Sequence, residues 1–234
     1  MSSIIHTGDA LEILRTMPGE SFDAVVTDPP YGMDFQSDRR IKSARLQKIA
    51  NDKNPFIWWL YDAIRVTKTG GALVSFCDWK NSETWRMAIT AAGWEIKSQV
   101  IWDRMNHGMG DLKAMFGPRH DVIWFAVKGK FQFPGKMPAS VLPFMRINGE
   151  QLVHPNQKPP ALMEYICRVV CPPGGTVLDP FAGSGSTGEG AMAAGCNFVG
   201  CELDPGYAAL SRKRLDDLAL HCPLTATPHV EPTT

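Results

Sequence analysis

Short apolar runs alternate along this chain with longer segments whose apolar residues recur at helical spacing. Residues 23–27, with the sequence DAVVT, are typical of a buried strand, whereas Leu162, Met163 and Ile166 follow the spacing of a helix. Predicted strands span residues 3–7, 23–27, 72–77, 94–102, 121–127, 176–178 and 197–201, and predicted helices span 10–17, 55–67, 81–92, 159–170, 186–194 and 205–218. The alternation predicts an α/β fold with a mostly parallel sheet and helices on both faces.

Two local features refine this prediction. The helix at 55–67 is expected to be stopped by Gly70 and Gly71. The link between the strands at 94–102 and 121–127 contains no helix, and a parallel pair would need a long crossover. We therefore expect one antiparallel strand, 121–127, in the edge region of the sheet.

Three connections are too long and too polar to be simple turns. They span residues 32–54, 103–119 and 128–155, and lysines and arginines are frequent in them. In the third, Phe131, Phe133 and Phe144 are interleaved with basic residues. Solvated linkers are one interpretation, but long connections in a small domain are usually functional. Together the three loops favour a nucleic-acid surface.

Composition limits the other possibilities. The 234 residues suffice for one domain, here predicted as residues 1–220 followed by a flexible tail at 221–234. The formal net charge of zero argues against a polycation that coats nucleic acid, although it leaves room for a local basic surface. Because the chain shows neither a membrane span nor a signal peptide, we expect a cytoplasmic protein. The six cysteines form no Cys-x-x-Cys pair, so we expect reduced, buried thiols and no metal.

The first motif with chemical meaning is Asp28-Pro29-Pro30-Tyr31, at the end of the strand 23–27. The carboxylate can accept hydrogen bonds, the prolines stiffen the turn, and the tyrosine offers a flat stacking face. This combination suits a planar exocyclic amine, such as that of adenine or cytosine. The alternative is that Asp28 only helps to form a turn.

The second motif is a glycine-rich turn between a predicted strand and a predicted helix. Residues 183–188, with the sequence GSGSTG, satisfy G-x-G-x-x-G, and Glu202 ends the next strand, where a ribose-binding acid is expected. These features indicate a nucleotide-like cofactor, and a nicotinamide dinucleotide is one candidate. A tight turn without a ligand is the other interpretation. A P-loop is excluded, because no Gly-Lys-Ser/Thr follows.

Both motifs together resemble the S-adenosylmethionine-dependent amino-group DNA methyltransferases. The segment 179–187, DPFAGSGST, is similar to their cofactor loop, and residues 28–31, DPPY, are similar to their catalytic motif. Residues 154–159 resemble the family's His-x-x-Gln-Lys-Pro segment. The resemblance covers residues from about 4 to 217, and the catalytic motif precedes the cofactor loop, as in the β class. It implies a Rossmann-like, doubly wound sheet, with a catalytic half at about 1–127, a recognition segment at about 128–155 and a cofactor half at about 156–220.

The resemblance also implies roles for individual residues. The catalytic group would be Asp28, Pro29, Pro30 and Tyr31, and the cofactor would be bound by Asp9, Asp28, Lys158, Asp179, Phe181, Gly183, Ser184, Gly185 and Glu202. Phe181 would pack on the cofactor's adenine, Glu202 would bind the ribose, and Asp9 would bind the adenine edge. Lys158 would lie near the methionine carboxylate. A helix cap is the alternative for Asp9, and a solvated lysine is the alternative for Lys158.

The substrate expected from the resemblance is a base in DNA, flipped out of the duplex and held by the three basic loops. Asp rather than Ser at position 28 resembles the adenine-N6 enzymes, with cytosine-N4 as the alternative. An NAD-dependent oxidoreductase is a more distant alternative, as is a DNA-binding module without activity. The short recognition segment suggests relaxed or short-site specificity. A solitary enzyme, a member of a restriction-modification pair and a homodimer all remain open.

Overall fold

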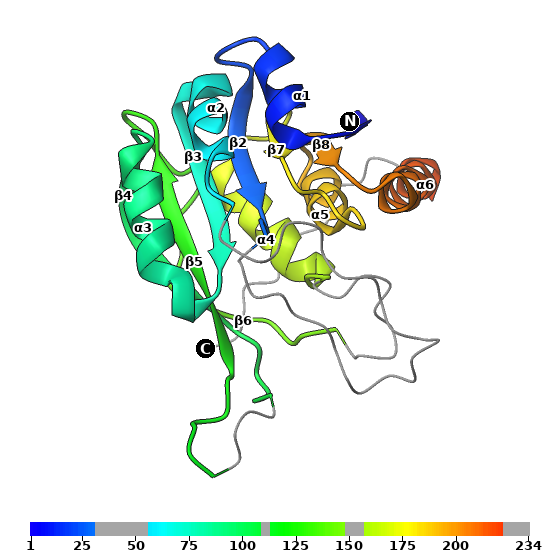
Figure 1. Ribbon diagram of the computed structural model, residues 1–234. Helices are drawn as coiled ribbons and strands as arrows, with labels where there is room; N and C mark the ends of the chain where they lie inside the picture. The colour runs from blue at the N-terminus through cyan, green and yellow to red at the C-terminus, as the bar shows by residue number, and fades with distance from the viewer. Residues whose placement is uncertain (31–55, 109–112, 148–156, 222–234) are drawn as a thin grey trace.

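The structure, a computed structural model, describes residues 1–30, 56–108, 113–147 and 157–221. Within these ranges, eight strands form one sheet with the order β1-β8-β7-β2-β3-β5-β4-β6 (Figure 1). The strands are β1 Ser3–Thr7, β2 Phe22–Thr27, β3 Thr67–Cys77, β4 Glu95–Asp103, β5 His120–Val127, β6 Val141–Pro143, β7 Thr176–Asp179 and β8 Asn197–Glu202. Every pairing is parallel except those of β5, which is antiparallel to both β3 and β4. The predicted, mostly parallel sheet with one antiparallel strand is confirmed.

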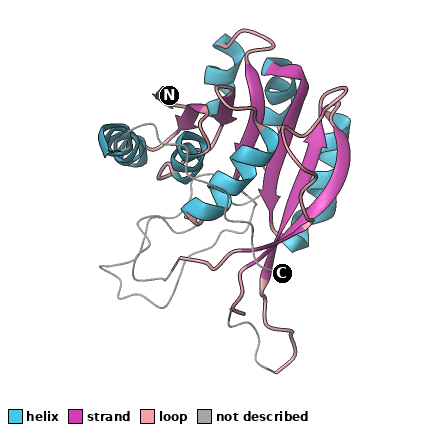
Figure 2. Ribbon diagram, turned by 180° about the vertical axis from the view of Figure 1, so that it is seen from behind, coloured by secondary structure: helices cyan, strands magenta, loops and turns pink. Residues whose placement is uncertain are grey.

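Helices cover both faces of the sheet. They are α1 Ala10–Thr16, α2 Trp59–Val66, α3 Ser82–Ala91, α4 Pro160–Val170, α5 Ser186–Ala193 and α6 Pro205–His221. The first three pack on one face and the last three on the other, so α3 lies before the sheet in Figure 1 and α4 before it in Figure 2. Along β2, Val25 packs in the core beneath α1, α2 and α3, whereas Ala24 and Val26 pack in the core beneath α4, α5 and α6. A strand buried on both faces explains the uninterrupted apolar run.

The predicted stop of the second helix by Gly70 and Gly71 is wrong, although the helix ends within one residue of its predicted end. Helix α2 ends at Val66, and β3 begins at the next residue, so Gly70 and Gly71 lie inside a strand. A Cβ on Gly71 would lie 2.8 Å from the carbonyl oxygen of Asp23. The register of β2 against β3 also shifts between Phe22 and Ala24. The glycine thus serves a strand irregularity and close backbone approach rather than a helix stop.

The segment between β5 and α4 differs from the expected basic, aromatic loop. It contains the short strand β6, which pairs with the end of β4. Phe131 and Phe133 pack on Phe125 with ring centroids 5.4 and 5.5 Å away, and Phe144 packs on Tyr165 at 5.6 Å. These rings are partly buried and pack against the core of the domain, so much of their surface is not available for stacking on bases.

Lys128, the first basic residue of this segment, is bound by other parts of the domain. Its ammonium donates to Glu20 and to the carbonyl of Thr67, both at 2.7 Å. Thr67 begins β3, so this contact lies at the amino edge of the parallel strands, opposite the edge where Asp28 follows β2. The expectation that the whole segment 128–155 faces the substrate is therefore wrong for its first part. Residues 148–156 and the tail at 222–234 lie outside the described residues.

Two further findings concern the expectations about a membrane span and about the cysteines. Among the described helices, none is long and apolar enough to cross a bilayer. The cysteines in the described ranges, which leave out Cys222, are free thiols, and all of them are buried.

Candidate active site

The two sequence motifs meet where the chain reverses its direction of travel across the sheet. From β7 the chain proceeds to β8 on one side, whereas from β2 it proceeds to β3 on the other, and β2 and β7 are neighbours. Ligands in such sheets bind beyond the carboxyl ends of the strands at this switch point. Here those ends carry Asp28 after β2 and Asp179 at the end of β7.

Asp179 joins the two strand ends. Its Oδ1 accepts a hydrogen bond of 2.6 Å from the Thr27 hydroxyl and one of 3.0 Å from the Phe181 backbone N–H. The side chain is 1% exposed. Burial raises the pKa of the Asp179 carboxyl to about 6, although hydrogen bonds from Thr187 and Thr27 oppose the shift. Asp179 therefore shapes the turn that carries Phe181, and its binding to a cofactor stays a prediction.

This burial predicts a pH effect on stability. Because the folded-state pKa lies above the ordinary value of 3.8, the folded protein binds more protons than the unfolded chain between about pH 4 and 6. Stability contributed by the neutral carboxyl is therefore lost as the pH rises through this window. Relative to an Asp179→Asn variant, the wild-type free energy of unfolding should fall by about 3 kcal/mol between pH 3 and 7. Urea titrations at several pH values measure the difference, and a difference independent of pH would contradict this role of burial.

Asp28 forms an ion pair across the site. The Lys158 ammonium lies 2.5 Å from Oδ2 of Asp28, and the two side chains are 9% and 16% exposed. The same ammonium lies 4.9 Å from the ring centroid of Phe76. The alternative of a solvated lysine at position 158 is thus wrong. Pro29 and Pro30 follow Asp28 at the same strand end, whereas Tyr31 lies outside the described residues.

Phe181 lies on the wall of the site, supported by other aromatic rings. Its ring meets Trp59 and Phe56 edge-on, with centroids 5.5 and 6.1 Å apart. Such contacts fix the orientation of a ring whose remaining surface can pack on a ligand. The backbone then turns through Gly183 and Gly185, whose φ values of 52° and 86° favour glycine.

Among the predicted cofactor-binding residues, Gly185 packs against α6 and does not line the cavity. A Cβ at this position would lie 2.5 Å from the Ser211 hydroxyl of α6, so the glycine permits close packing of the turn against that helix. It is absent from the residues that line the cavity described below. A cofactor contact by Gly185 stays a prediction.

Glu202 braces the glycine turn from the end of β8. Its two carboxylate oxygens accept hydrogen bonds of 2.8 Å from the backbone N–H groups of Gly183 and Asp204. Burial raises the pKa of the Glu202 carboxyl, although these backbone donors lower it in part. A carboxylate has about four acceptor positions, so acceptor capacity remains for hydroxyl groups of a ligand.

Asp9 has the capping role that the sequence offered as an alternative. Its Oδ1 accepts a hydrogen bond of 2.8 Å from the Leu11 N–H at the start of α1. It also lines the cavity, so the capping interaction holds a carboxylate at its rim. Binding of an adenine edge by Asp9 stays a prediction.

These residues surround one cavity of about 310 Å³. Its walls include most of the residues nominated from the sequence, namely Asp9, Asp28, Pro29, Pro30, Lys158, Asp179, Phe181, Gly183, Ser184 and Glu202. The structure adds Phe56 and Tyr207, which the sequence analysis missed. Tyr207 lies in the first turn of α6, five residues after Glu202 in the sequence. Its closeness to Glu202 along the chain could have indicated that it lines the same site. An aromatic wall, a glycine turn and a braced carboxylate fit a nucleoside with a charged tail.

Comparison with known proteins supplies the family. A family model described as DNA methylase, for the N6 and N4 amino-group enzymes, matches residues 22–148 and 139–213. The chain belongs to this DNA methylase family. The resemblance to S-adenosylmethionine-dependent amino-group DNA methyltransferases is confirmed, and the interpretations as an oxidoreductase or as a DNA-binding module without activity are excluded.

Two relatives match this chain in sequence over nearly its whole length. The methylase YubD and the DNA adenine methyltransferase YhdJ, both of Escherichia coli (strain K12), are 32% and 30% identical to it. Each match covers 92% of this chain, and the matches cover 90% and 82% of the relatives.

Solved structures of the family show the same arrangement. The M1.HpyAVI–SAM complex is 26% identical, with a TM-score of 0.72, over 91% of this chain and 100% of that one. The cytosine-N4-specific PvuII DNA methyltransferase has a TM-score of 0.71 at 18% identity, over 93% of this chain and 91% of that one. At that identity the likeness concerns the fold alone.

Proposed function

We propose that this DNA methylase transfers the methyl group of S-adenosylmethionine to the exocyclic N6 amino group of adenine in DNA. The observation that carries the proposal is the position of Asp28, whose carboxylate borders the same cavity as Phe181 and Glu202. A donor bound between the aromatic wall and Glu202 would therefore lie next to an acceptor for the target amine. When bound, the cofactor would supply a methyl group on a positively charged sulfur and would leave as S-adenosylhomocysteine, while the methylated amine loses a proton.

The protein's own residues act on the amine. In free adenine the nitrogen lone pair is delocalised into the ring, which makes the amine a poor nucleophile. Hydrogen bonds from the amine to the Asp28 carboxylate and the Pro29 carbonyl would draw the nitrogen toward tetrahedral geometry. The carboxylate also stabilises the positive charge that develops on nitrogen. Pro29 and Pro30 fix the turn that holds both acceptors, so positioning contributes as well.

Adenine is favoured over cytosine by two observations. Position 28 carries aspartate rather than serine, and the relative YhdJ is named as a DNA adenine methyltransferase. Cytosine N4 is the second candidate, because the PvuII enzyme with the same fold acts there.

Expression in a methylation-deficient bacterial host tests the assignment. Modified bases mapped across the host genome should be N6-methyladenine within a short sequence context, and an Asp28→Asn control should produce none. N4-methylcytosine would replace the proposal by the second candidate. Modification confined to one long site would contradict the prediction of relaxed or short-site specificity.

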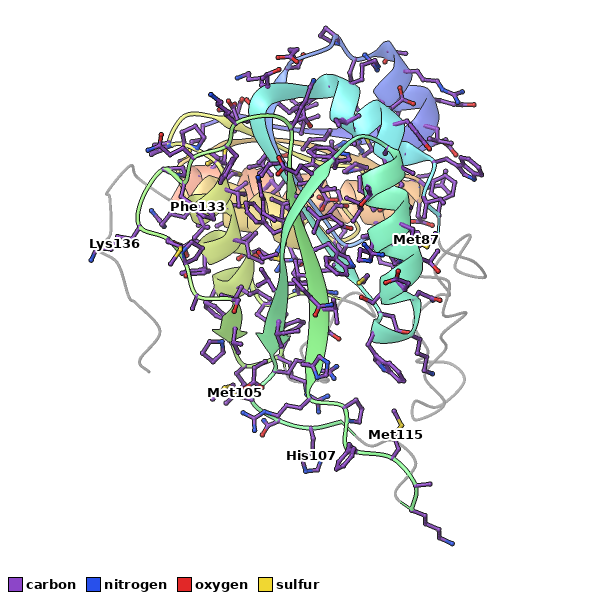
Figure 3. All side chains as sticks on the ribbon, turned by 90° about the vertical axis from the view of Figure 1, so that its left-hand side faces the viewer. Met87, Met105, His107, Met115, Phe133 and Lys136 are labelled. Atoms are coloured by element: carbon purple, nitrogen blue, oxygen red, sulfur yellow. The ribbon has the colours of Figure 1, made fainter. Side chains whose placement is uncertain are left out.

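DNA contact is proposed for the arm formed by residues 104–108 and 113–119, called here the β4–β5 arm. It leaves the sheet at the end of β4, which runs parallel to β2 and β3, so it emerges at the same edge as Asp28 (Figure 1). Figure 3 shows Met105, His107 and Met115 on this arm, remote from Phe133 and Lys136. The predicted loop 32–54 lies outside the described residues, and its DNA contact stays a prediction.

The base of the β4–β5 arm is held in shape by its own hydrogen bonds. The backbone N–H of Arg104 donates to Arg119 over 3.0 Å, and that of Gly108 donates to Pro118 over 2.8 Å. The Arg119 guanidinium donates two bonds, of 2.6 and 2.7 Å, to Asp103. These bonds lower the pKa of the Asp103 carboxyl. The arm thus holds Phe116 in solvent, where 99% of it is exposed.

A fully exposed phenylalanine on such an arm can stack on an unpaired base or fill the gap left by a flipped one. Phe116→Ala should therefore weaken DNA binding by about 5- to 150-fold, the equivalent of about 1–3 kcal/mol of stacking. Phe116→Tyr should retain the affinity. Fluorescence anisotropy with a labelled duplex measures the effect.

The matched control is Met137→Ala, because Met137 is 85% exposed but lies on the segment between β5 and β6. It should leave the affinity for DNA unchanged. Both alanine variants should melt like the wild type, since neither side chain is packed. Equal affinities of Phe116→Ala and the wild type would remove Phe116 from the DNA surface.

A further inference from the structure

The ion pair between Lys158 and Asp28 connects the catalytic motif at 28–31 with the segment 154–159, which precedes the cofactor half of the chain. Lys158 precedes α4 and lies 130 residues from Asp28, yet its ammonium lies 2.5 Å from the carboxylate. The lysine is 7% exposed. Phe76 of β3 lies below the same ammonium, at 4.9 Å from the ring centroid. A cation over a ring and against a carboxylate is held in place from two sides.

Asp28 faces charge of both signs. Lys158, the Asp179 carboxyl and the Cys77 thiol are among the described titratable groups that interact with it electrostatically. Asp179 is a second carboxylate, and burial raises the pKa of the Cys77 thiol to about 12, so that thiol stays neutral. Two carboxylates in one site disfavour each other's ionisation. The Lys158 ammonium opposes this effect, because a positive charge next to Asp28 favours the ionised carboxylate.

The charge state of Asp28 decides what it offers to a base. An ionised carboxylate accepts hydrogen bonds only, whereas a protonated one also donates. The target amine needs an acceptor that is already oriented when the base enters. We propose that Lys158 is a positioning residue that keeps Asp28 ionised and turned toward the amine, beyond any contact with the cofactor's carboxylate. The functional part of this inference rests on the proposed amine methylation.

The first experiment measures Asp28 directly, without cofactor or DNA. Carboxyl carbons of ¹³C-labelled aspartate are titrated by NMR, and the Asp28 signal is assigned by its loss in Asp28→Asn. In Lys158→Met, which retains the aliphatic bulk without the charge, the pKa of Asp28 should rise by about 1–3 units. Lys158→Arg should leave the pKa of Asp28 as in the wild type, and Asp179→Asn should shift it in the opposite direction to Lys158→Met. An unchanged pKa in Lys158→Met would overturn the proposal.

The second experiment separates positioning from cofactor binding. If Lys158 acts on Asp28, the acidic limb of the kcat profile of Lys158→Met should move to higher pH by the same 1–3 units. The Kd for S-adenosylmethionine, measured by calorimetry, reports any contact of Lys158 with the cofactor separately. A large rise in Kd with an unmoved pH profile would show a cofactor ligand only, and would refute the inference.

A substitute variant and the cofactor-free titration keep the test of Lys158 decisive. If Lys158→Met does not fold, Lys158→Gln gives the same readouts with a side chain that still donates a hydrogen bond. If the wild type methylates no DNA, the proposed function fails, but the NMR titration still tests the effect of Lys158 on Asp28. The two failures are therefore distinguishable.

Discussion

Asp28→Asn should abolish methyl transfer while leaving S-adenosylmethionine bound. The substitution keeps the size of the side chain but replaces a charged acceptor by a neutral amide, which stabilises the developing positive charge far less. Loss of one such group from an active site reduces turnover by about 10²- to 10³-fold or more. Incorporation of labelled methyl groups into an adenine-containing duplex measures turnover, and calorimetry measures the cofactor. Turnover within tenfold of the wild type would contradict the assignment of Asp28.

The ion pair makes the choice of variant important. Asp28→Ala would deprive the Lys158 ammonium of this carboxylate in a site where the lysine side chain is 9% exposed. Removal of one partner from a buried pair typically costs about 3–5 kcal/mol. The double variant Asp28→Asn with Lys158→Met removes both charges. It should be as inactive as the single variant but more stable than Asp28→Ala, so loss of activity is separated from loss of fold.

Gly190→Ala should destabilise the whole domain. A Cβ on Gly190 of α5 would lie 2.5 Å from the carbonyl carbon of Met163 and 2.6 Å from the backbone nitrogen of Glu164. Both atoms belong to the backbone of α4, which cannot turn aside as a flexible side chain would. The two helices must separate, at a cost of about 3 kcal/mol or more. Urea denaturation followed by circular dichroism measures this loss.

Gly135→Ala is the matched control, because a Cβ there meets nothing within 4 Å. Its stability should stay within about 0.5 kcal/mol of the wild type. Helix α5 also begins at the glycine turn, so Gly190→Ala should weaken cofactor binding in step with its loss of stability. A Gly190→Ala variant as stable as the Gly135→Ala control would show that α4 and α5 do not meet closely at this glycine.

The alternation of apolar patterns predicted the sheet well, because β2 and β7 are buried on both faces and read as continuous apolar runs. The pattern misled at Gly71, because a glycine can either end a helix or permit close approach of two strands. Gly71 marked a helix stop in the pattern, yet it permits close approach between β2 and β3. A single sequence does not distinguish these two uses of glycine, because the partner strand is far away along the chain.

The site was predictable where chemistry is local and not where it depends on distant partners. The Asp-Pro-Pro turn and the glycine turn each carry their meaning within a few residues. The pairing of Lys158 with Asp28 does not, since only the folded sheet brings them together. The same reason applies to Phe131 and Phe133, which were expected in a basic, aromatic loop but pack on Phe125.

The topology has a consequence for the order of the chain itself. Strand β1 pairs with β8, and Arg212 of α6 donates to the Ile5 carbonyl, so the last helix lies against the first strand. The catalytic turn and the glycine turn meet only through neighbouring strands, β2 and β7. Neither half therefore needs to be synthesised first. A circular permutant that opens the chain between β6 and α4 should rebuild the same cavity with its two motifs in reversed order.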